Sequence, residues 1–326
     1  MALIGKKDVL QWTRLSRRHS VFQELYTKQK QAVWFPEEIN VQIDINDYQW
    51  LTQEEKNLFH QLVAYFTTTE LLVQNVLGES FYPYVIDPRA KMCMTVQMFM
   101  EDIHSDFFEM ILNSFSLDHE SLYNIAESNP IIARKQQMVA HYANAISISQ
   151  WGVDPDSVEG KKAILMAILI NNVIQEGFWF YSGFAMFFAM RETGRMRNIC
   201  NGIDLVLIDE SFHMRMGVEM ILTMLEETPE IGQDAAFVAN VQQCLIDGVE
   251  IELEFLKSLL GDRQVFGLSF NEMAQYLKFV ADRRMEELGF SPHYMIEHNP
   301  LKFLEKQDLM TLQNFFEITP NQYTNF

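Results

Sequence analysis

Two carboxylates stand alone in stretches of sequence that otherwise carry no charge. Glu70 is the only charged residue in positions 57–78, and Glu176 is the only one in positions 163–190. A carboxylate inside an apolar helix costs several kcal/mol unless a partner neutralises it. A salt bridge to a distant arginine, or a helix face that touches water, would explain one such residue. Two of them favour a shared cation.

Two Glu-x-x-His motifs accompany these carboxylates, Glu101-Asp-Ile-His104 and Glu210-Ser-Phe-His213. A spacing of three residues places both side chains of a motif on one helix face, where they can reach the same metal ion. Taken separately, either motif is better explained by a surface ion pair or by a hydrogen-bonded core histidine. The two motifs indicate a metal site only in combination with the lone carboxylates.

The order Glu, Glu-x-x-His, Glu, Glu-x-x-His along four long helices is the ligand set of ferritin-like dimetal carboxylate bundles. Four carboxylates and two divalent ions bring opposite charges of equal size, so such a core would be neutral. Carboxylate and imidazole ligands suit iron or manganese, whereas thiolate ligands are missing. The sequence contains no HExxH, P-loop, GxGxxG or nucleophile-elbow motif that competes with this interpretation.

Long gaps between prolines and clear helix-start patterns predict an all-α chain. The start patterns are Thr52-Gln-Glu-Glu55, Asp87-Pro88, Asn129-Pro130 and Ser269-Phe-Asn-Glu272. We expect helices at about 53–78, 88–115, 130–150, 160–190, 195–226, 233–260 and 269–288. Strand patterns are nearly absent. The expected organisation is an N-terminal arm with some helix (1–50), a ferritin-like four-helix bundle with additional helices (51–290) and an extended C-terminal tail (291–326).

The segment 163–190 is apolar and long enough to span a bilayer. However, Asn171, Asn172, Gln175, Glu176 and Ser182 interrupt it, and no second apolar segment of this length exists. A helix that is apolar on all sides is also what the centre of a large bundle requires. We therefore expect a buried core helix and no membrane span.

Charge and cysteine content restrict the partners and the compartment. The formal net charge is −19, with 25 Lys and Arg against 44 Asp and Glu, which disfavours a nucleic-acid or anionic membrane partner. The three cysteines, at positions 93, 200 and 244, form no CxxC pair and indicate a reducing compartment. The N-terminus lacks an apolar core long enough for a signal peptide, so a cytoplasmic location is expected.

Several motifs together resemble the radical-generating small subunit of class I ribonucleotide reductase, from about Trp34 to Tyr323. The resemblance is carried by Trp34-Phe-Pro-Glu-Glu-Ile39, Glu101 with His104, Glu176-Gly-Phe-Trp-Phe-Tyr-Ser-Gly-Phe184, Asp209-Glu210-Ser-Phe-His213 and Asn314-Phe-Phe-Glu317 followed by Tyr323. It implies that six residues are the metal ligands, namely Glu70, Glu101, His104, Glu176, Glu210 and His213.

The same resemblance assigns a path for an electron. Trp34, hydrogen-bonded to Asp209 and so to His104, would begin the route to the partner, and Tyr323 would carry the radical across the subunit interface. Phe180 and Phe184 would help to keep the site dry, although two such residues on an apolar helix are equally well ordinary core.

Two departures from the commoner family pattern concern the radical itself. The radical-bearing tyrosine normally follows the first ligand histidine by four residues, where this chain has Phe108. The first ligand is Glu70, where many relatives have Asp. Both features resemble the class Ic subgroup, in which an Mn/Fe pair stores the oxidising equivalent; Fe/Fe and Mn/Mn centres are the alternatives, and a tyrosine such as Tyr181 could hold a radical instead. A lesser departure is Ile208, where relatives often carry Arg.

The expected function is therefore that of the ribonucleoside-diphosphate reductase small subunit. Its dimetal site would activate molecular oxygen and store one oxidising equivalent, which passes to a large subunit docked on the C-terminal tail for reduction of ribonucleotides to deoxyribonucleotides. The resemblance also implies a homodimer. The rival functions are a free-standing dimetal oxidase or oxygenase and, from another class, an iron-storage protein; both leave the aromatic C-terminal segment unexplained.

Overall fold

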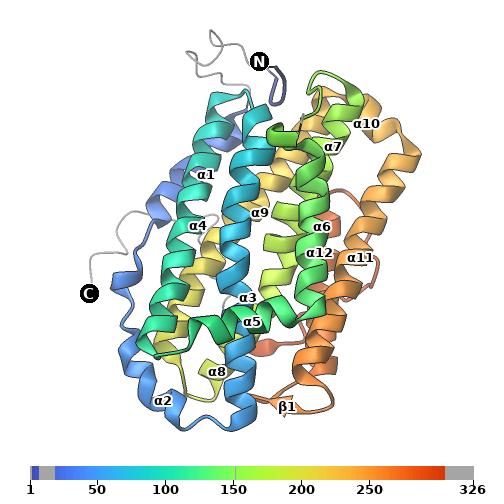
Figure 1. Ribbon diagram of the computed structural model, residues 1–326. Coiled ribbons are helices and arrows are strands. Elements are labelled where there is room, and N and C mark those ends of the chain that lie inside the picture. Colours follow the sequence, from blue (N-terminus) through green and yellow to red (C-terminus); the bar gives the residue numbers. More distant parts are fainter. Residues whose placement is uncertain (1, 7–18, 151, 305–326) are drawn as a thin grey trace.

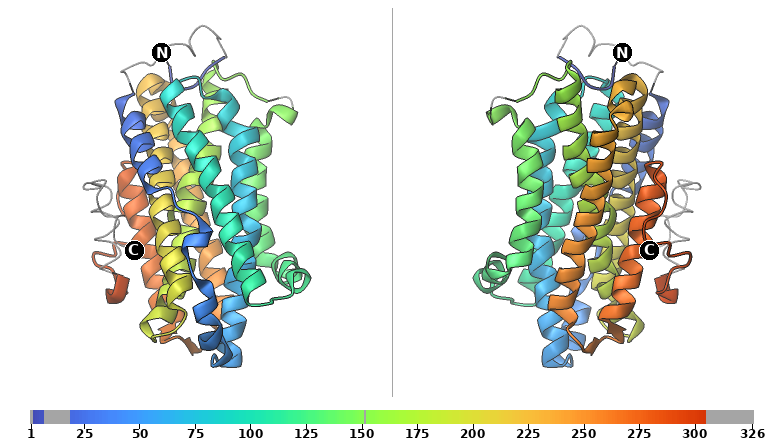
Figure 2. Two further views of the ribbon diagram at one scale, coloured as in Figure 1. Left: turned by 90° about the vertical axis from the view of Figure 1, so that its left-hand side faces the viewer. Right: turned by 90° about the vertical axis from the view of Figure 1, so that its right-hand side faces the viewer.

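The computed structural model describes residues 2–6, 19–150 and 152–304. Long helices run alongside one another and form an elongated bundle, while the short helix α5 crosses its side (Figures 1 and 2). The α-helices are α1 (Ser20–Ala32), α2 (Ile45–Gln49), α3 (Gln53–Val76), α4 (Pro88–Ser114), α5 (His119–Ser128), α6 (Pro130–Ile146), α7 (Val158–Ile168), α8 (Phe180–Glu192), α9 (Arg197–Glu227), α10 (Pro229–Gln233), α11 (Ala235–Leu260) and α12 (Phe270–Glu287).

The expected all-helical fold and all seven expected helices are present, and each start pattern caps a helix. Thr52 accepts a hydrogen bond from the Glu55 amide at 3.2 Å, and the Glu55 carboxylate accepts from the Thr52 amide at 2.8 Å. Ser269 and Glu272 make the same reciprocal pair at the start of α12. Two orphan amides at each helix start are thereby satisfied, which explains why local sequence fixes these boundaries.

The helix expected at 160–190 differs from a regular α-helix in its middle. Residues Leu169–Trp179 are π-helical and join α7 to α8. A second π-helical stretch, Leu77–Phe81, follows α3. Such wider turns have no clear sequence signal and occur frequently at functional sites. Glu176 lies within the longer of the two.

The apolar helix Val158–Glu192 occupies the interior of the bundle. It is the one helix, among the described residues, that is long and apolar enough to cross a membrane, and 94% of its most apolar window is buried. Its π-helical segment and α8 both pack against α9. Helix α9 also contacts α4, and α4 packs against α3. The burial agrees with the expectation of a core helix rather than a membrane span.

The N-terminal arm packs on the bundle instead of standing apart from it. Phe22 and Leu25 of α1 belong to the same buried cluster as Leu62 of α3, and α1 lies against α4 and α9. Short 3-10 turns at Pro36–Glu38 and Val41–Asp44 lead into α2. The division into arm, bundle and tail therefore remains a prediction about folding units.

Several elements were not expected from the sequence. These are α5, α10, three further 3-10 turns (Tyr82–Tyr84, Ile148–Gln150, Lys302–Leu304) and a hairpin of β1 (Gln264–Val265) and β2 (Leu268–Ser269). In the hairpin turn, Phe266 and Gly267 have positive φ angles of 51° and 77°, as a two-residue primed turn requires. Strands of two residues are too short to show an alternating pattern, so the hairpin could not be predicted from the sequence.

The chain after α12 is held against the bundle as far as the structure describes it. Asp282 accepts hydrogen bonds from the amides of His293 and Tyr294, both at 2.8 Å, and from that of Ile296 at 2.9 Å. The predicted docking segment, from Asn314 to Tyr323, lies outside the described residues.

Candidate metal centre

Four elements of the bundle bring six carboxylate and imidazole side chains to its centre. Glu70 comes from α3, Glu101 and His104 from α4, Glu176 from the π-helical segment, and Glu210 and His213 from α9. All six are 0% exposed. They include both carboxylates that stand alone in the sequence and both Glu-x-x-His motifs.

The six side chains form two groups that share two members. Glu70, Glu101, His104 and Glu210 make one group, and Glu101, Glu176, Glu210 and His213 make the other; within each group one ligand atom per residue lies within 4.8 Å of the rest. Two adjacent ions, with the carboxylates of Glu101 and Glu210 between them, fit this arrangement.

The imidazole Nδ1 atoms point at the carboxylates. His104 Nδ1 lies 3.2 Å from Glu210 Oε1, 3.5 Å from Glu101 Oε2 and 3.7 Å from Glu70 Oε2. His213 Nδ1 lies 3.0 Å from Glu101 Oε1 and 3.8 Å from Glu176 Oε2. Each histidine therefore faces its own group with the same ring atom.

Several of these polar atoms have no hydrogen-bond partner although they are buried. Both oxygens of Glu70 and Glu101, Oε1 of Glu210 and Nδ1 of His104 are in this state. Among the described residues, the ion pairs of the four carboxylates involve only the two histidines, with no Lys or Arg. Buried oxygens without donors are what a metal ion would satisfy, so this donor set fits two divalent cations.

In the metal-free protein, bound protons have to offset the negative charge of the four buried carboxylates. Burial raises the pKa of Glu70 to about 8 and raises that of Glu176 well above its usual range. Burial by itself would lower the pKa of His104 and His213, but the surrounding carboxylates outweigh it and raise both pKa values well above 6.5. A metal ion that binds here has to displace protons.

A hydrogen-bonded chain leads from the cluster to the N-terminal arm. His104 Nε2 lies 3.2 Å from Asp209 Oδ2, which also accepts the indole N–H of Trp34 at 2.8 Å. Trp34 is buried and stacks on the His104 ring, with 6.3 Å between the centroids. An N–H on Nε2 would leave the lone pair of His104 Nδ1 directed at the carboxylates. The contacts among Trp34, Asp209 and His104 expected from the sequence are thus present.

Three side-chain amides surround Glu176 and were not among the predicted site residues. Asn171 donates to Glu176 Oε1 at 2.7 Å, and Gln97 donates to Oε2 at 2.9 Å. Asn172 lies 3.4 Å from the same Oε2 and donates to the His213 carbonyl at 3.1 Å. The available signal was helical spacing, because Gln97 precedes Glu101, and Asn172 precedes Glu176, by four residues.

Phe108 lies in an apolar wall of stacked rings. Phe66 of α3 stacks on Phe108 at 5.1 Å and on Phe184 at 5.3 Å, and it contacts Phe180 at 5.1 Å. All four side chains are at most 1% exposed. The position four residues after His104 therefore carries no O–H group and is buried among aromatic rings.

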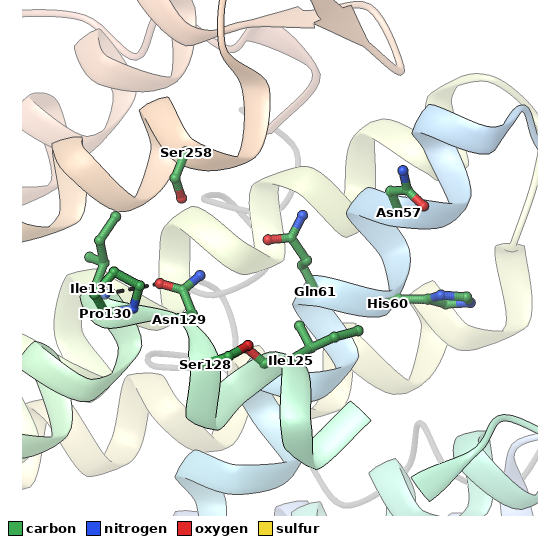
Figure 3. A pocket seen from close by; sticks show the side chains of 9 residues that line it. All are labelled: Asn57, His60, Gln61, Ile125, Ser128, Asn129, Pro130, Ile131 and Ser258. Atoms are coloured by element: carbon green, nitrogen blue, oxygen red, sulfur yellow. Dashed lines mark hydrogen bonds between the residues drawn. The ribbon is translucent and has the colours of Figure 1, made fainter. Parts of the chain in front are cut away.

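A surface pocket near the far end of α3 is separate from this cluster. Figure 3 shows Gln61 of α3, Asn129 at the start of α6 and Ser258 of α11 around it, together with other uncharged side chains. Gln61 lies nine residues before Glu70, two and a half turns along the helix. None of the six clustered side chains lines this pocket.

Comparisons with known proteins agree with this geometry. The family described as "Ribonucleotide reductase, small chain" matches residues 11–300. The chain is 28% identical over 308 residues to human ribonucleoside-diphosphate reductase subunit M2, covering 94% of this chain and 72% of that protein. It is 27% identical over 297 residues to the beta subunit of Chlamydia pneumoniae, covering 89% and 83%.

Solved structures share the fold. A ribonucleotide reductase R2 subunit from Clostridium botulinum superposes with a TM-score of 0.82 at 20% identity, covering 94% of both chains. The dimanganese(II)-NrdF of Streptococcus sanguinis superposes with a TM-score of 0.76 at 17% identity, covering 93% of this chain and 99% of that one. The helical architecture around the six buried side chains is thus that of known R2 proteins.

Proposed function

The chain belongs to the family of ribonucleotide reductase small chains, and on that premise we propose how its own residues hold metals and pass on an oxidising equivalent. It is the small subunit of a ribonucleoside-diphosphate reductase, an enzyme that works with a large subunit, and it carries a dinuclear metal centre. Membership of this family favours that function over a free-standing oxidase or an iron store.

The six ligands of this centre are Glu70, Glu101, His104, Glu176, Glu210 and His213. The observation that carries the assignment is their complete burial together with unpartnered oxygens and no Lys or Arg counter-ion. When bound, the two metals supply a one-electron oxidising equivalent obtained from molecular oxygen. The phenylalanines around Phe66 exclude water from that side, which protects a strong oxidant from reduction.

Phe108 supports assignment to the class Ic subgroup with an Mn/Fe pair. Phenylalanine has no O–H to lose, and Phe108 packs against the rings of Phe66 and Phe107. A persistent radical at this position is therefore disfavoured, and the oxidising equivalent has to be stored elsewhere. Fe/Fe and Mn/Mn centres remain the alternatives to be measured.

Trp34 and Asp209 begin the route by which the oxidising equivalent leaves. Trp34 would give one electron to the oxidised metal centre, and its Nε1 proton would move along the 2.8 Å hydrogen bond to Asp209 Oδ2, which would leave a neutral indole radical. Asp209 also orients His104 through the Nε2 contact. One carboxylate thereby links ligand geometry to the exit of the oxidising equivalent.

The remaining partners follow from the sequence of the tail and from the family. We propose a homodimer in the cytoplasm whose large subunit docks on the segment from Asn314 onward, with Tyr323 as the residue that carries the radical across. Deletion of Gln322–Phe326 should abolish nucleotide reduction and leave metal loading and oxygen consumption intact. Equal turnover by the shortened chain would contradict the role of Tyr323.

Metal analysis combined with electron paramagnetic resonance tests the centre. Oxygen-activated protein should contain one manganese and one iron per chain and show no persistent tyrosyl signal. A stable tyrosyl radical in fully active protein, or full activity with iron alone, would overturn the class Ic assignment.

A pair of tryptophan variants tests the route by which the oxidising equivalent leaves the metal centre. Trp34→Phe should load the same metals and show the same oxidised spectrum, yet lose nucleotide reduction. Trp50→Phe is the matched control, since Trp50 is 83% exposed. Full turnover by Trp34→Phe would exclude Trp34 from the route.

A further inference from the structure

Two cations are buried in the described part of the chain, and both lie on aromatic rings that could be oxidised. Lys135 of α6 is 2% exposed and Arg284 of α12 is 8% exposed; every other Lys and Arg side chain of the described residues is more exposed. Burying a cation is costly, so its position inside a bundle calls for an explanation.

Lys135 contacts two oxidisable rings. Its Nζ lies 4.1 Å from the centroid of Tyr65 and 5.2 Å from that of Trp179, as well as 4.1 Å from that of Phe255. The ammonium pairs with Glu252, whose other oxygen accepts the Ser182 hydroxyl. Burial lowers the pKa of Lys135, and the Glu252 carboxylate and the aromatic faces oppose this by favouring the charged ammonium.

Arg284 lies over a third oxidisable ring, that of Tyr181. Its guanidinium carbon lies 5.0 Å from the centroid of Tyr181. Nε donates to the Gly177 carbonyl at 2.8 Å, and NH1 pairs with Glu287 at 3.1 Å. The carbonyl bond anchors the guanidinium to the segment that carries Glu176.

These three rings are close to the ligands along the chain. Tyr65 precedes Glu70 by five residues, which is a rise of about 7.5 Å along α3. Trp179 and Tyr181 follow Glu176 by three and five residues. They are thus the Trp and Tyr residues within five positions of the two carboxylates that stand alone in the sequence.

A cation on the face of a ring opposes loss of an electron from it. Oxidation makes the ring positive, and a second positive charge 4.1 to 5.2 Å away in a medium of low dielectric raises the energy of the oxidised state. Tyrosine also has to lose its phenolic proton, yet the Tyr65 hydroxyl has no hydrogen-bond partner among the described residues.

Trp34 has the opposite surroundings. Its indole N–H is donated to the carboxylate of Asp209, and no Lys or Arg side chain of the described residues lies over the Trp34 ring. A negative partner that also accepts the proton favours oxidation of this ring over the other three.

We propose that Lys135 and Arg284 are positioning residues that make Tyr65, Trp179 and Tyr181 hard to oxidise, so that the electron is drawn from Trp34. This inference rests on the proposed route through Trp34. The cations take no part in electron transfer, because they act only on the energies of the neighbouring rings.

The first test removes the charge of the Lys135–Glu252 pair while keeping its volume. In Lys135→Met/Glu252→Gln, the half-life of the stored oxidising equivalent should fall about tenfold or more. A transient tyrosyl signal should appear, narrow on ring deuteration of tyrosine and vanish when Tyr65→Phe is added. Lys91→Met is the matched control, because Lys91 lies 3.8 Å from the ring of the partly exposed Tyr82 and should change neither quantity.

The second test uses Arg284 and does not depend on the folding of the first variant. Arg284→Met should place oxidation damage on Tyr181, seen by peptide mass spectrometry after repeated activation, whereas Arg284→Lys should suppress it. Rescue by the lysine variant separates a charge effect from a packing effect, because both replacements remove the guanidinium.

The outcomes distinguish this inference from the proposed route. Unchanged half-life and no new radical or oxidised residue in the folded variants, with Trp34→Phe inactive, would overturn the role of the cations alone. Full turnover by Trp34→Phe would overturn the route itself. A radical on Tyr65 or Tyr181 already present in unaltered, fully active protein would also overturn the inference.

Discussion

Two clusters of buried charge lie in the same bundle and are neutralised in different ways. Glu252 of α11 meets its own cation, Lys135 of α6, and the pair needs nothing from outside the chain. Among the described residues, the four carboxylates at the centre form ion pairs only with His104 and His213. Both clusters are buried, so burial alone does not reveal which carboxylates bind a metal ion.

The two clusters differ in the source of the positive charge that neutralises their carboxylates. A buried carboxylate that forms an ion pair with a Lys of the chain is neutralised as folded, whereas the central carboxylates, which pair with no Lys or Arg among the described residues, need added cations. The sequence offered both explanations for a lone buried glutamate. Within the described residues, the salt-bridge explanation holds at Glu252, and the shared-cation explanation is the one that fits Glu70 and Glu176.

The largest expected effect is loss of the metals from the central cluster. Glu101→Ala removes a carboxylate shared by both groups, so metal affinity should fall by more than about a hundredfold and nucleotide reduction should disappear. Metal content after desalting measures this. Glu109→Ala, on the same helix and outside the cluster, is the control; two firmly bound metals in Glu101→Ala would contradict the shared role.

The next effect concerns the pair that carries its own cation. Lys135→Met alone leaves Glu252 buried without a counter-ion and should lower the free energy of unfolding by about 3–5 kcal/mol. Adding Glu252→Gln should recover most of that loss. Urea denaturation of the metal-free proteins measures both values, and equal stability of the single and double variants would show that the two charges are independent.

A smaller effect is expected from the amides around Glu176. Asn171→Ala removes the 2.7 Å hydrogen bond to Glu176 Oε1 and should weaken binding of the metal on that side by about tenfold to a hundredfold. Asn75→Ala, which removes an exposed amide that donates to the Leu71 carbonyl, is the matched control. Calorimetric titration should show one weakened site and one unchanged site.

The smallest effect is a gain of stability in the absence of metal. The pKa of Glu70 is raised from 4.5 to about 8, so the folded state keeps a proton that the unfolded state loses, and metal-free protein should lose stability as pH rises through that window. Glu70→Gln cannot ionise and should be about 1–2 kcal/mol more stable than the unaltered chain near pH 8.

Thermal melts between pH 5 and pH 8 measure this gain. The two metal-free proteins should converge toward the acid end of the range. Glu252→Gln should instead be less stable than the unaltered chain, so the two Glu→Gln substitutions are expected to have opposite signs. A loss of stability in Glu70→Gln would mean that the central carboxylates are neutralised within the chain.

The helices and the choice of ligands could be predicted because their signals are local. Capping at Thr52 and Ser269 depends on residues three positions apart, and the face shared by Glu101 and His104 depends on helical spacing alone. The π-helical turn at Leu169–Trp179 could not be predicted, because it depends on packing against α9 rather than on any residue pattern.

The sequence by itself determined that the chain is helical, that two lone glutamates and two Glu-x-x-His motifs lie on four separate helices, and that Phe108 cannot hold a phenoxyl radical. Only the tertiary structure decided which carboxylates lie between both histidines, which amides hold Glu176, and that Lys135 serves Glu252 instead of the central cluster. The physical reason is that spacing along a helix fixes the direction of a side chain, whereas its partner is fixed by how the helices pack.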